Sequence, residues 1–226
     1  MTLFVTALKR SFHSVANAII IMVLPLAFVL FPIYDPTDIP QGLYWYGLIV
    51  LFSAFLLAKQ LIDNRTNRTI IRIAASPISH FRYLAIHLLS FTVILWIQNT
   101  VFFIVMKLYW GDAIESAFWT LSLYYVLSVT MIALCLFWNS LFRTYYTSLA
   151  FFAGVASLLT MITGVTVPLD VLPDSILEVA RFLPTYWFAY GLEMVYNGHV
   201  NDVLTSLLIM LIFAVLFLVV GSRRRL

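Results

Sequence analysis

Few side chains in this 226-residue sequence have the type and spacing that catalysis or metal binding requires. The four histidines, His13, His80, His87 and His199, lie on different segments, and only His87 lies near the interior of a long apolar stretch. The sequence contains no H-E-x-x-H zinc pair, no G-x-S-x-G nucleophile turn and no G-x-x-x-x-G-K-[ST] phosphate loop. We therefore predict no catalytic residue, no metal site and no cofactor bound by this chain.

Two neighbouring amides, Gln98 and Asn99, lie near the middle of the third apolar stretch of the sequence. Polar groups inside such a stretch are costly and usually face protein. They could contact a ligand or form hydrogen bonds between helices, and the sequence leaves both roles open. For His87, a hydrogen bond between helices or a polar lining is favoured over ligation of a metal or haem.

The composition identifies the kind of element that must position these side chains. Hydrophobic residues make up 63% of the chain and charged residues 10%, whereas ordinary globular chains have about 45–50% and about 25%. So few charges cannot cover a core of this size with a water-facing surface, which excludes a soluble enzyme and a nucleic-acid-binding module. The 16% of aromatic residues excludes disorder. The sequence predicts a polytopic membrane protein.

Six stretches without Asp, Glu, Lys or Arg are long enough to cross a membrane as helices. They are apolar on all sides, unlike the alternating strands of a membrane β-barrel. The sequence therefore predicts an all-α fold with six transmembrane helices in a single domain, residues 1–226, with spans at about 14–34, 40–60, 83–107, 116–139, 144–167 and 203–222.

Basic residues indicate how these spans are oriented. With the N-terminus in the cytoplasm, 11 of the 13 Lys and Arg residues lie on the inner side, and only Lys107 and Arg181 lie outside. Inner loops of membrane proteins carry an excess of Lys and Arg. We predict a multi-pass protein of the cytoplasmic membrane with both termini in the cytoplasm.

Two segments on the inner side have amphipathic patterns. In residues 1–13, apolar residues recur every three or four positions between polar ones, which predicts a short helix lying in the membrane interface. In the inner link 59–82, Ile70 and Ile73 share a helical face flanked by Arg68 and Arg72, and proline ends the pattern at position 77. This face would rest either on anionic lipid or on a protein partner, and the pattern itself does not decide between them.

A third segment, 164–201, connects the fifth and sixth predicted spans on the outer side. Three prolines divide it into pieces too apolar for a solvated loop. We expect a helix over Ser175–Leu183, capped by Asp174, and a re-entrant hairpin in the outer leaflet. Leu169, Ile176 and Phe182 are expected to be buried against the helix bundle.

The inner link and the outer segment together resemble one family. The link carries RTIIRIAASPIS over residues 68–79, followed by an aromatic and basic start to the third span. The outer segment carries G-x-x-x-P-L-D-x-L-P, then A-R-x-L-P, and its residues are Gly164, Pro168, Leu169, Pro173, Arg181 and Pro184. These motifs, the six spans and the interfacial N-terminus resemble the type-2 ABC exporter permeases over essentially the whole chain.

The resemblance implies a transport mechanism. The residues Arg68, Ile70, Arg72 and Ile73 would form a coupling helix that docks on a separate cytoplasmic ATPase subunit, which would bind the ATP and Mg. Two permease chains, identical or different, would enclose the path, and His87, Gln98 and Asn99 are the candidate path residues. The chain would then be a non-catalytic subunit that exports a drug, an antimicrobial peptide, a lipid or a glycan.

Two other functions remain open at this stage. One is the membrane subunit of a haem exporter for cytochrome c maturation, although no histidine- or tryptophan-rich haem site stands out. The other is an immunity or sensor protein that binds a toxin without pumping it. The arginine-flanked inner link favours the exporter, because a passive binder needs no cytoplasmic docking helix.

Overall fold

The computed structural model describes residue 23 and residues 25–30, 39–66, 80–111, 114 and 116–223. In these ranges all regular elements are helical, which confirms the predicted all-α class. They are the 3-10 helices η1 (Phe28–Leu30) and η3 (Leu169–Val171) and the α-helices α3 (Gln41–Thr66), α5 (His80–Trp110), α6 (Ala117–Leu141), α7 (Tyr145–Ile162), α8 (Asp174–Ala180), α9 (Pro184–Tyr196) and α10 (Val200–Arg223).

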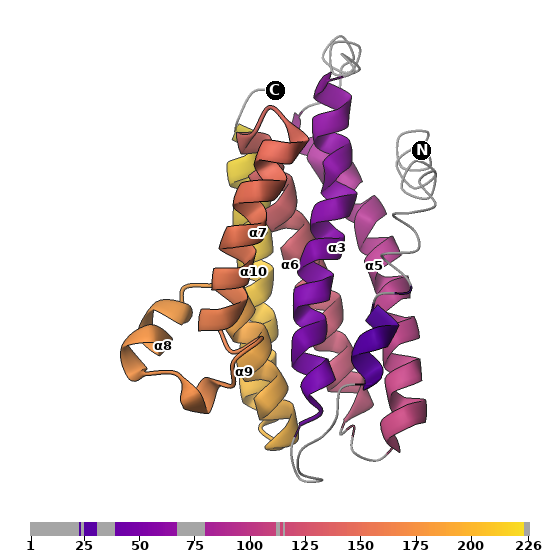
Figure 1. Cartoon of the computed structure of the whole chain (residues 1–226), viewed down its shortest axis with the longest axis vertical. Coiled ribbons are helices and arrows are strands. Elements are labelled where there is room, and N and C mark those ends of the chain that lie inside the picture. Colours follow the sequence, from indigo (N-terminus) through magenta and orange to yellow (C-terminus); the bar gives the residue numbers. More distant parts are fainter. Residues whose placement is uncertain are drawn as a thin grey trace.

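Five helical segments are long and apolar enough to cross a membrane: Gln41–Asp63, Phe81–Trp110, Ala117–Leu141, Tyr145–Ile162 and Val200–Arg223. They lie close to the last five spans expected from the sequence and run in alternating directions along one bundle (Figure 1). The protein is therefore a polytopic membrane protein. Most of the first expected span, the interfacial helix 1–13 and the link residues 67–79 lie outside the described residues.

Helix α6 organises the bundle, since it packs against α3, α5, α7, α9 and α10. Aromatic rings fill the space between these helices: Tyr46 of α3 stacks on Phe102 of α5 at 3.6 Å, and Phe55 of α3 stacks on Phe152 of α7 at 4.2 Å between ring centroids. In the most apolar 18-residue stretch of α3, 67% is buried inside the chain, whereas in the corresponding stretches of α7 and α10 only 22% is buried. Helices α7 and α10 therefore present most of their apolar surface to the exterior of this chain.

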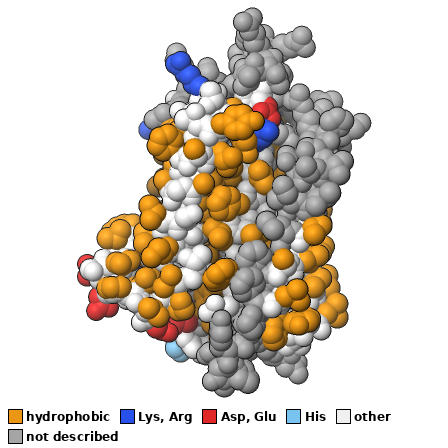
Figure 2. Space-filling view, viewed as in Figure 1, with side chains coloured by type: hydrophobic (Ala, Val, Ile, Leu, Met, Phe, Trp, Pro, Cys, Tyr) orange, Lys and Arg blue, Asp and Glu red, His pale blue; other side chains and the backbone are white. Residues whose placement is uncertain are grey.

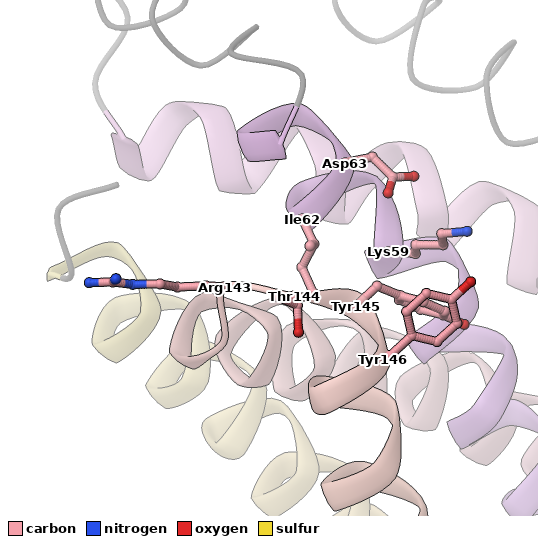
Figure 3. A pocket seen from close by; sticks show the side chains of 7 residues that line it. All are labelled: Lys59, Ile62, Asp63, Arg143, Thr144, Tyr145 and Tyr146. Atoms are coloured by element: carbon pink, nitrogen blue, oxygen red, sulfur yellow. The ribbon is translucent and has the colours of Figure 1, made fainter.

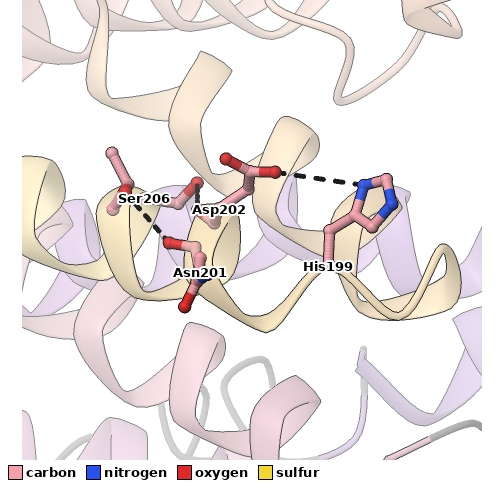
Figure 4. Close-up of polar contacts among 5 residues, drawn as sticks. His199, Asn201, Asp202 and Ser206 are labelled. Carbon is pink, nitrogen blue, oxygen red and sulfur yellow. Dashed lines mark hydrogen bonds and ion pairs between the residues drawn. The ribbon is translucent and has the colours of Figure 1, made fainter.

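Helix α9 packs closely against α6 and α10 at Gly191. A Cβ at this position would lie 2.8 Å from Leu123 Cδ2 and 3.1 Å from Ser206 Cβ, so a larger residue would require these neighbours to shift. At the start of α10, His199 Nδ1 lies 3.9 Å from Asp202 Oδ2, and Ser206 donates a 2.9 Å hydrogen bond to the Asp202 carbonyl (Figure 4). Beyond this local turn, α10 packs against α9.

Charged side chains of the described residues gather at the two ends of the bundle (Figure 2). One end, where α3 and α10 finish, carries Lys59, Asp63, Arg82, Arg143 and Arg223; it is called the basic end below. The opposite, acidic end carries Lys107, Asp170, Asp174, Glu178, Arg181, Glu193 and Asp202. This separation of charge agrees with the sequence, in which most Lys and Arg residues fall on one side of the predicted spans.

Candidate functional site

A buried hydrogen-bond network joins α3, α5 and α6 in the half of the bundle toward the acidic end, and Asn99 is its centre. Asn99 is fully buried. Its Oδ1 accepts a 2.7 Å hydrogen bond from the Tyr46 hydroxyl, and its Nδ2 donates to the Tyr124 carbonyl at 3.0 Å and to Ser128 Oγ at 2.7 Å. Tyr124 extends the network by donating a 2.6 Å bond to the Leu43 carbonyl. Both N–H directions of the amide are therefore used within the protein, as a role in helix packing requires.

The neighbouring Gln98 is bonded less completely. It is 2% exposed, and its Nε2 lies 3.4 Å from Ser53 Oγ of α3. Its Oε1 has no hydrogen-bond partner in the described part of the chain. An unpartnered buried acceptor is uncommon in proteins, so Gln98 keeps a polar atom that could accept a hydrogen bond from a ligand or from water.

The third candidate path residue, His87, lies elsewhere on α5. Its ring is 4.5 Å from the Tyr83 ring in an edge-on arrangement and 5.4 Å from the Phe91 ring. At 1.5 Å per residue, His87 and Gln98 are about 16 Å apart along the helix axis, so they do not share one compact site. In the described residues no group of three His, Cys, Asp or Glu side chains could hold a metal ion.

The outer-segment motif forms a folded corner at the acidic end. Gly164 has φ +86°, a left-handed conformation that strongly favours glycine. A Cβ at this position would also lie 2.6 Å from Leu169 Cγ and 3.1 Å from Ala189 Cβ. Pro168 precedes η3 with extended backbone, and the Leu169 side chain folds back over Gly164. This part of the motif thus turns the chain from α7 toward α9.

The rest of the motif starts and stops the two following helices. Pro173 is the N-cap of α8, and Pro184 is the first residue of α9, where its missing N–H is not needed. The Arg181 carbonyl accepts a 2.9 Å hydrogen bond from Trp187 Nε1, which ties the end of α8 to α9. These residues have backbone roles in the structure, and α8 projects to the side of the bundle (Figure 1).

Three details of the outer segment differ from the sequence prediction. The helix ends at Ala180 rather than Leu183, because Leu183 is extended (φ −114°, ψ 138°), as the residue before a proline prefers. Asp174 lies inside the first turn instead of capping it. The expected burial of Phe182 is wrong: its side chain is 79% exposed, while Leu169 and Ile176 are half-buried.

An acidic pocket of about 250 Å³ lies between the start of α3, η3 and α9. Its lining includes Tyr44, Leu169, Asp170 and Glu193. Partial burial raises the pKa of the Glu193 carboxyl, and the nearby Asp170 carboxylate raises it further. Both effects disfavour the charged form of Glu193.

The sequence analysis identified Asn99, the centre of the buried network, but did not identify its hydrogen-bond partners. It also did not predict the acidic pocket. The predicted coupling residues Arg68, Ile70, Arg72 and Ile73 lie outside the described residues. The sequence analysis assigned no role to Tyr46 or Tyr124, although both are 0% exposed and hydrogen-bonded. Ser128, four residues after Tyr124 on the same helical face, was the available signal.

Comparison with known proteins defines the class of this membrane protein. Residues 41–223 match the family described as ABC-2 family transporter protein. The match covers more than half of the chain, which therefore belongs to the ABC-2 family of membrane permeases, whose members are non-catalytic transmembrane subunits of ABC transporters. Permeases of this family generally work together with an ATPase subunit.

A curated relative is the linearmycin resistance permease protein LnrN of Bacillus subtilis (strain 168), which is 29% identical over 182 residues. The alignment covers 78% of this chain but 46% of that protein, so the chain spans about half the length of the relative that it matches. No solved structure matches the chain.

Proposed function

We propose that this chain is the membrane subunit of an ATP-driven ABC exporter that moves its substrate outward across the bacterial cytoplasmic membrane. The observation that carries the proposal is the family match over residues 41–223. The separation of charge between the basic and acidic ends supports a cytoplasmic position for both termini. The energy would come from ATP and Mg bound by a separate ATPase, since this sequence has no phosphate loop.

The ATPase would dock at the basic end, on the link that follows α3. Helix α3 continues to Thr66, six residues beyond the expected end of its span, and so forms the first part of the link 59–82. There Ile70 and Ile73 would enter an apolar groove of the ATPase, and Arg68 and Arg72 would face its acidic rim.

A second permease chain, identical or different, would pack against the exposed face of α7. Ala150, Gly154 and Ser157 are exposed on this helix, and a Cβ added to Gly154 would meet no atom within 4 Å. Small residues let transmembrane helices approach closely. The low burial of α7 within this chain supports such a contact.

The substrate class that we favour is an antimicrobial compound. The relative LnrN is named for resistance to linearmycin, and drugs and antimicrobial peptides are among the classes that the sequence leaves open, beside lipids and glycans. In this proposal His87, Gln98 and Asn99 contribute to the polar path. Gln98 is the strongest of the three because its Oε1 is free to accept a hydrogen bond.

Growth in the presence of the antimicrobial tests the proposal. The chain is expressed in a sensitive bacterium with its ATPase, or with an ATPase whose catalytic glutamate is replaced by glutamine. Resistance that needs the active ATPase, with substrate-stimulated ATP hydrolysis in membrane vesicles, is expected. Resistance that persists with the inactive ATPase would instead indicate an immunity protein that binds without pumping.

A further inference from the structure

A pocket of about 640 Å³ lies at the basic end, where α3 finishes and the chain turns from α6 into α7 (Figure 3). Its lining residues are Lys59, Ile62, Asp63, Arg143, Thr144, Tyr145 and Tyr146. This volume lies in the range of small-ligand pockets, about 300–1,000 Å³. Neither the ATPase contact proposed for the link nor the path residues on α5 include any of these side chains.

The wall of the pocket is held rigidly. Tyr145 packs 5.9 Å from the Phe55 ring of α3. Directly beneath the turn, Trp138 Nε1 donates a 3.3 Å hydrogen bond to the Ser148 carbonyl, and Ser148 Oγ donates a 2.7 Å bond to Asn139 Oδ1. These contacts fix the α6–α7 turn and with it the tyrosine side of the pocket.

The pocket presents charges of both signs that do not neutralise each other. Lys59 Nζ lies 4.5 Å from the centre of the Tyr145 ring. Lys59 and Asp63 are one helical turn apart on α3, yet no ion pair within 4 Å joins these two described residues. Arg143 extends away from both on the far side of the pocket (Figure 3). An ammonium and a carboxylate therefore stand next to each other, each available to a ligand.

Exposed apolar side chains also lie along α7. Tyr146 is 81% exposed at the pocket, and Phe151, Val155 and Leu158 are exposed farther along the same helix. At 3.6 residues per turn these three side chains lie on a different face of α7 from the small residues proposed to contact the second permease chain. The acyl chains of a lipid with its polar part in the pocket would have this apolar face of α7 beside them.

We propose that this pocket binds the headgroup of a phospholipid that carries both a phosphodiester and a primary ammonium, as phosphatidylethanolamine does. Lys59 binds the phosphate, with hydroxyl groups of Thr144 and Tyr145 as further donors, and Asp63 accepts hydrogen bonds from the ammonium. Phosphatidylglycerol offers Asp63 no cation. Phosphatidylcholine offers it a quaternary ammonium without an N–H donor, so the mixed charge selects the ethanolamine headgroup.

Native mass spectrometry of the full-length purified chain tests the assignment. The chain is titrated in detergent with phosphatidylethanolamine, phosphatidylglycerol and phosphatidylcholine that have identical acyl chains. The ethanolamine lipid is expected to bind about tenfold more tightly than the other two, in line with hydrogen bonds to charged groups. Equal retention of the three lipids, or a preference for phosphatidylglycerol, would overturn the proposal.

Four variants separate the two charges from general surface electrostatics. Lys59→Gln should weaken retention of all three lipids about tenfold, whereas Lys59→Arg should retain binding. Asp63→Asn should abolish the preference for the ethanolamine lipid while phosphate binding persists. Arg223→Gln, a charge change at the same end but outside the pocket lining, should leave binding unchanged. If Arg223→Gln acts like Lys59→Gln, the basic end attracts lipid only through its net charge and the pocket is not a site.

Discussion

Replacing Asn99 by alanine should destabilise the helix bundle more than replacing its neighbour Gln98. The substitution removes three hydrogen bonds that join α5 to α3 and α6. Hydrogen bonds between membrane helices contribute about 0.6 kcal/mol each on average, which gives about 2 kcal/mol for three. The Tyr46 hydroxyl would also be left buried without its acceptor, at a further cost of about 1 kcal/mol or more. We expect Asn99→Ala to lower the free energy of unfolding by about 3 kcal/mol.

Gln98→Ala is the matched control on the same turn of α5. Both side chains are almost fully buried, but Gln98 makes one long hydrogen bond of 3.4 Å, so we expect a loss of about 1 kcal/mol from that bond and the cavity together. The larger glutamine would leave the larger cavity, so a pure cavity effect would reverse the order of the two variants. Unfolding in mixed detergent micelles, followed by tryptophan fluorescence, measures both free energies.

The outcome also distinguishes the two roles that the sequence leaves open for Asn99. A loss of stability with the predicted order supports the packing role. If Asn99→Ala unfolds at the same free energy as Gln98→Ala, the network does not hold the bundle and the reasoning from hydrogen-bond geometry is refuted. A variant that is fully stable but no longer transports would assign Asn99 to the substrate path.

Three further predictions concern other parts of the chain. Gly164→Ala should destabilise the protein by about 1–3 kcal/mol, because the backbone at this position is left-handed and the added Cβ would overlap Leu169 of η3. The control Gly154→Ala places its Cβ in open space on a helix, so it should be neutral or slightly stabilising in the same unfolding assay. Ile73→Asp should abolish co-purification of the ATPase while the chain still inserts and folds. Truncating a buried anchor costs about 1–2 kcal/mol of binding free energy, and the new carboxylate would be unpaired. Unchanged co-purification and ATP hydrolysis would mean that the link rests on lipid. A cysteine at Ser222 should react with a membrane-impermeant thiol reagent only from the cytoplasm and one at Ser175 only from outside, and the reverse pattern would invert the proposed topology.

The spans could be predicted from the sequence because a membrane imposes a local requirement. Each span must be about 20 apolar residues long and satisfy its own backbone hydrogen bonds, so hydropathy along the chain is sufficient. The five candidate spans of the described residues accordingly lie close to the expected ones. The breaks in the outer segment at the prolines and Gly164 could also be predicted from the sequence, since the backbone preferences of proline and glycine are properties of single residues.

The exposure of Phe182 shows where local reasoning fails. Its apolar character predicted burial within this chain, but a membrane protein has no aqueous penalty that forces an apolar side chain toward its own bundle. Lipid or a second chain can cover the Phe182 side chain just as well. The sequence therefore predicts that Phe182 avoids water, and only the packing of the helices decides what it contacts.

Sequence alone thus determined the class of fold, the places of the five described spans and the apolar, proline-interrupted character of the outer segment. Tertiary structure decided which polar groups meet: Asn99 with Tyr46 and Ser128, from three different helices, and Lys59 of α3 with the Tyr145 ring at the start of α7. The physical reason is that nearly all faces of these helices are apolar. Hydropathy consequently carries little information about rotation, and the face that each helix turns inward is set by contacts between residues far apart in the chain.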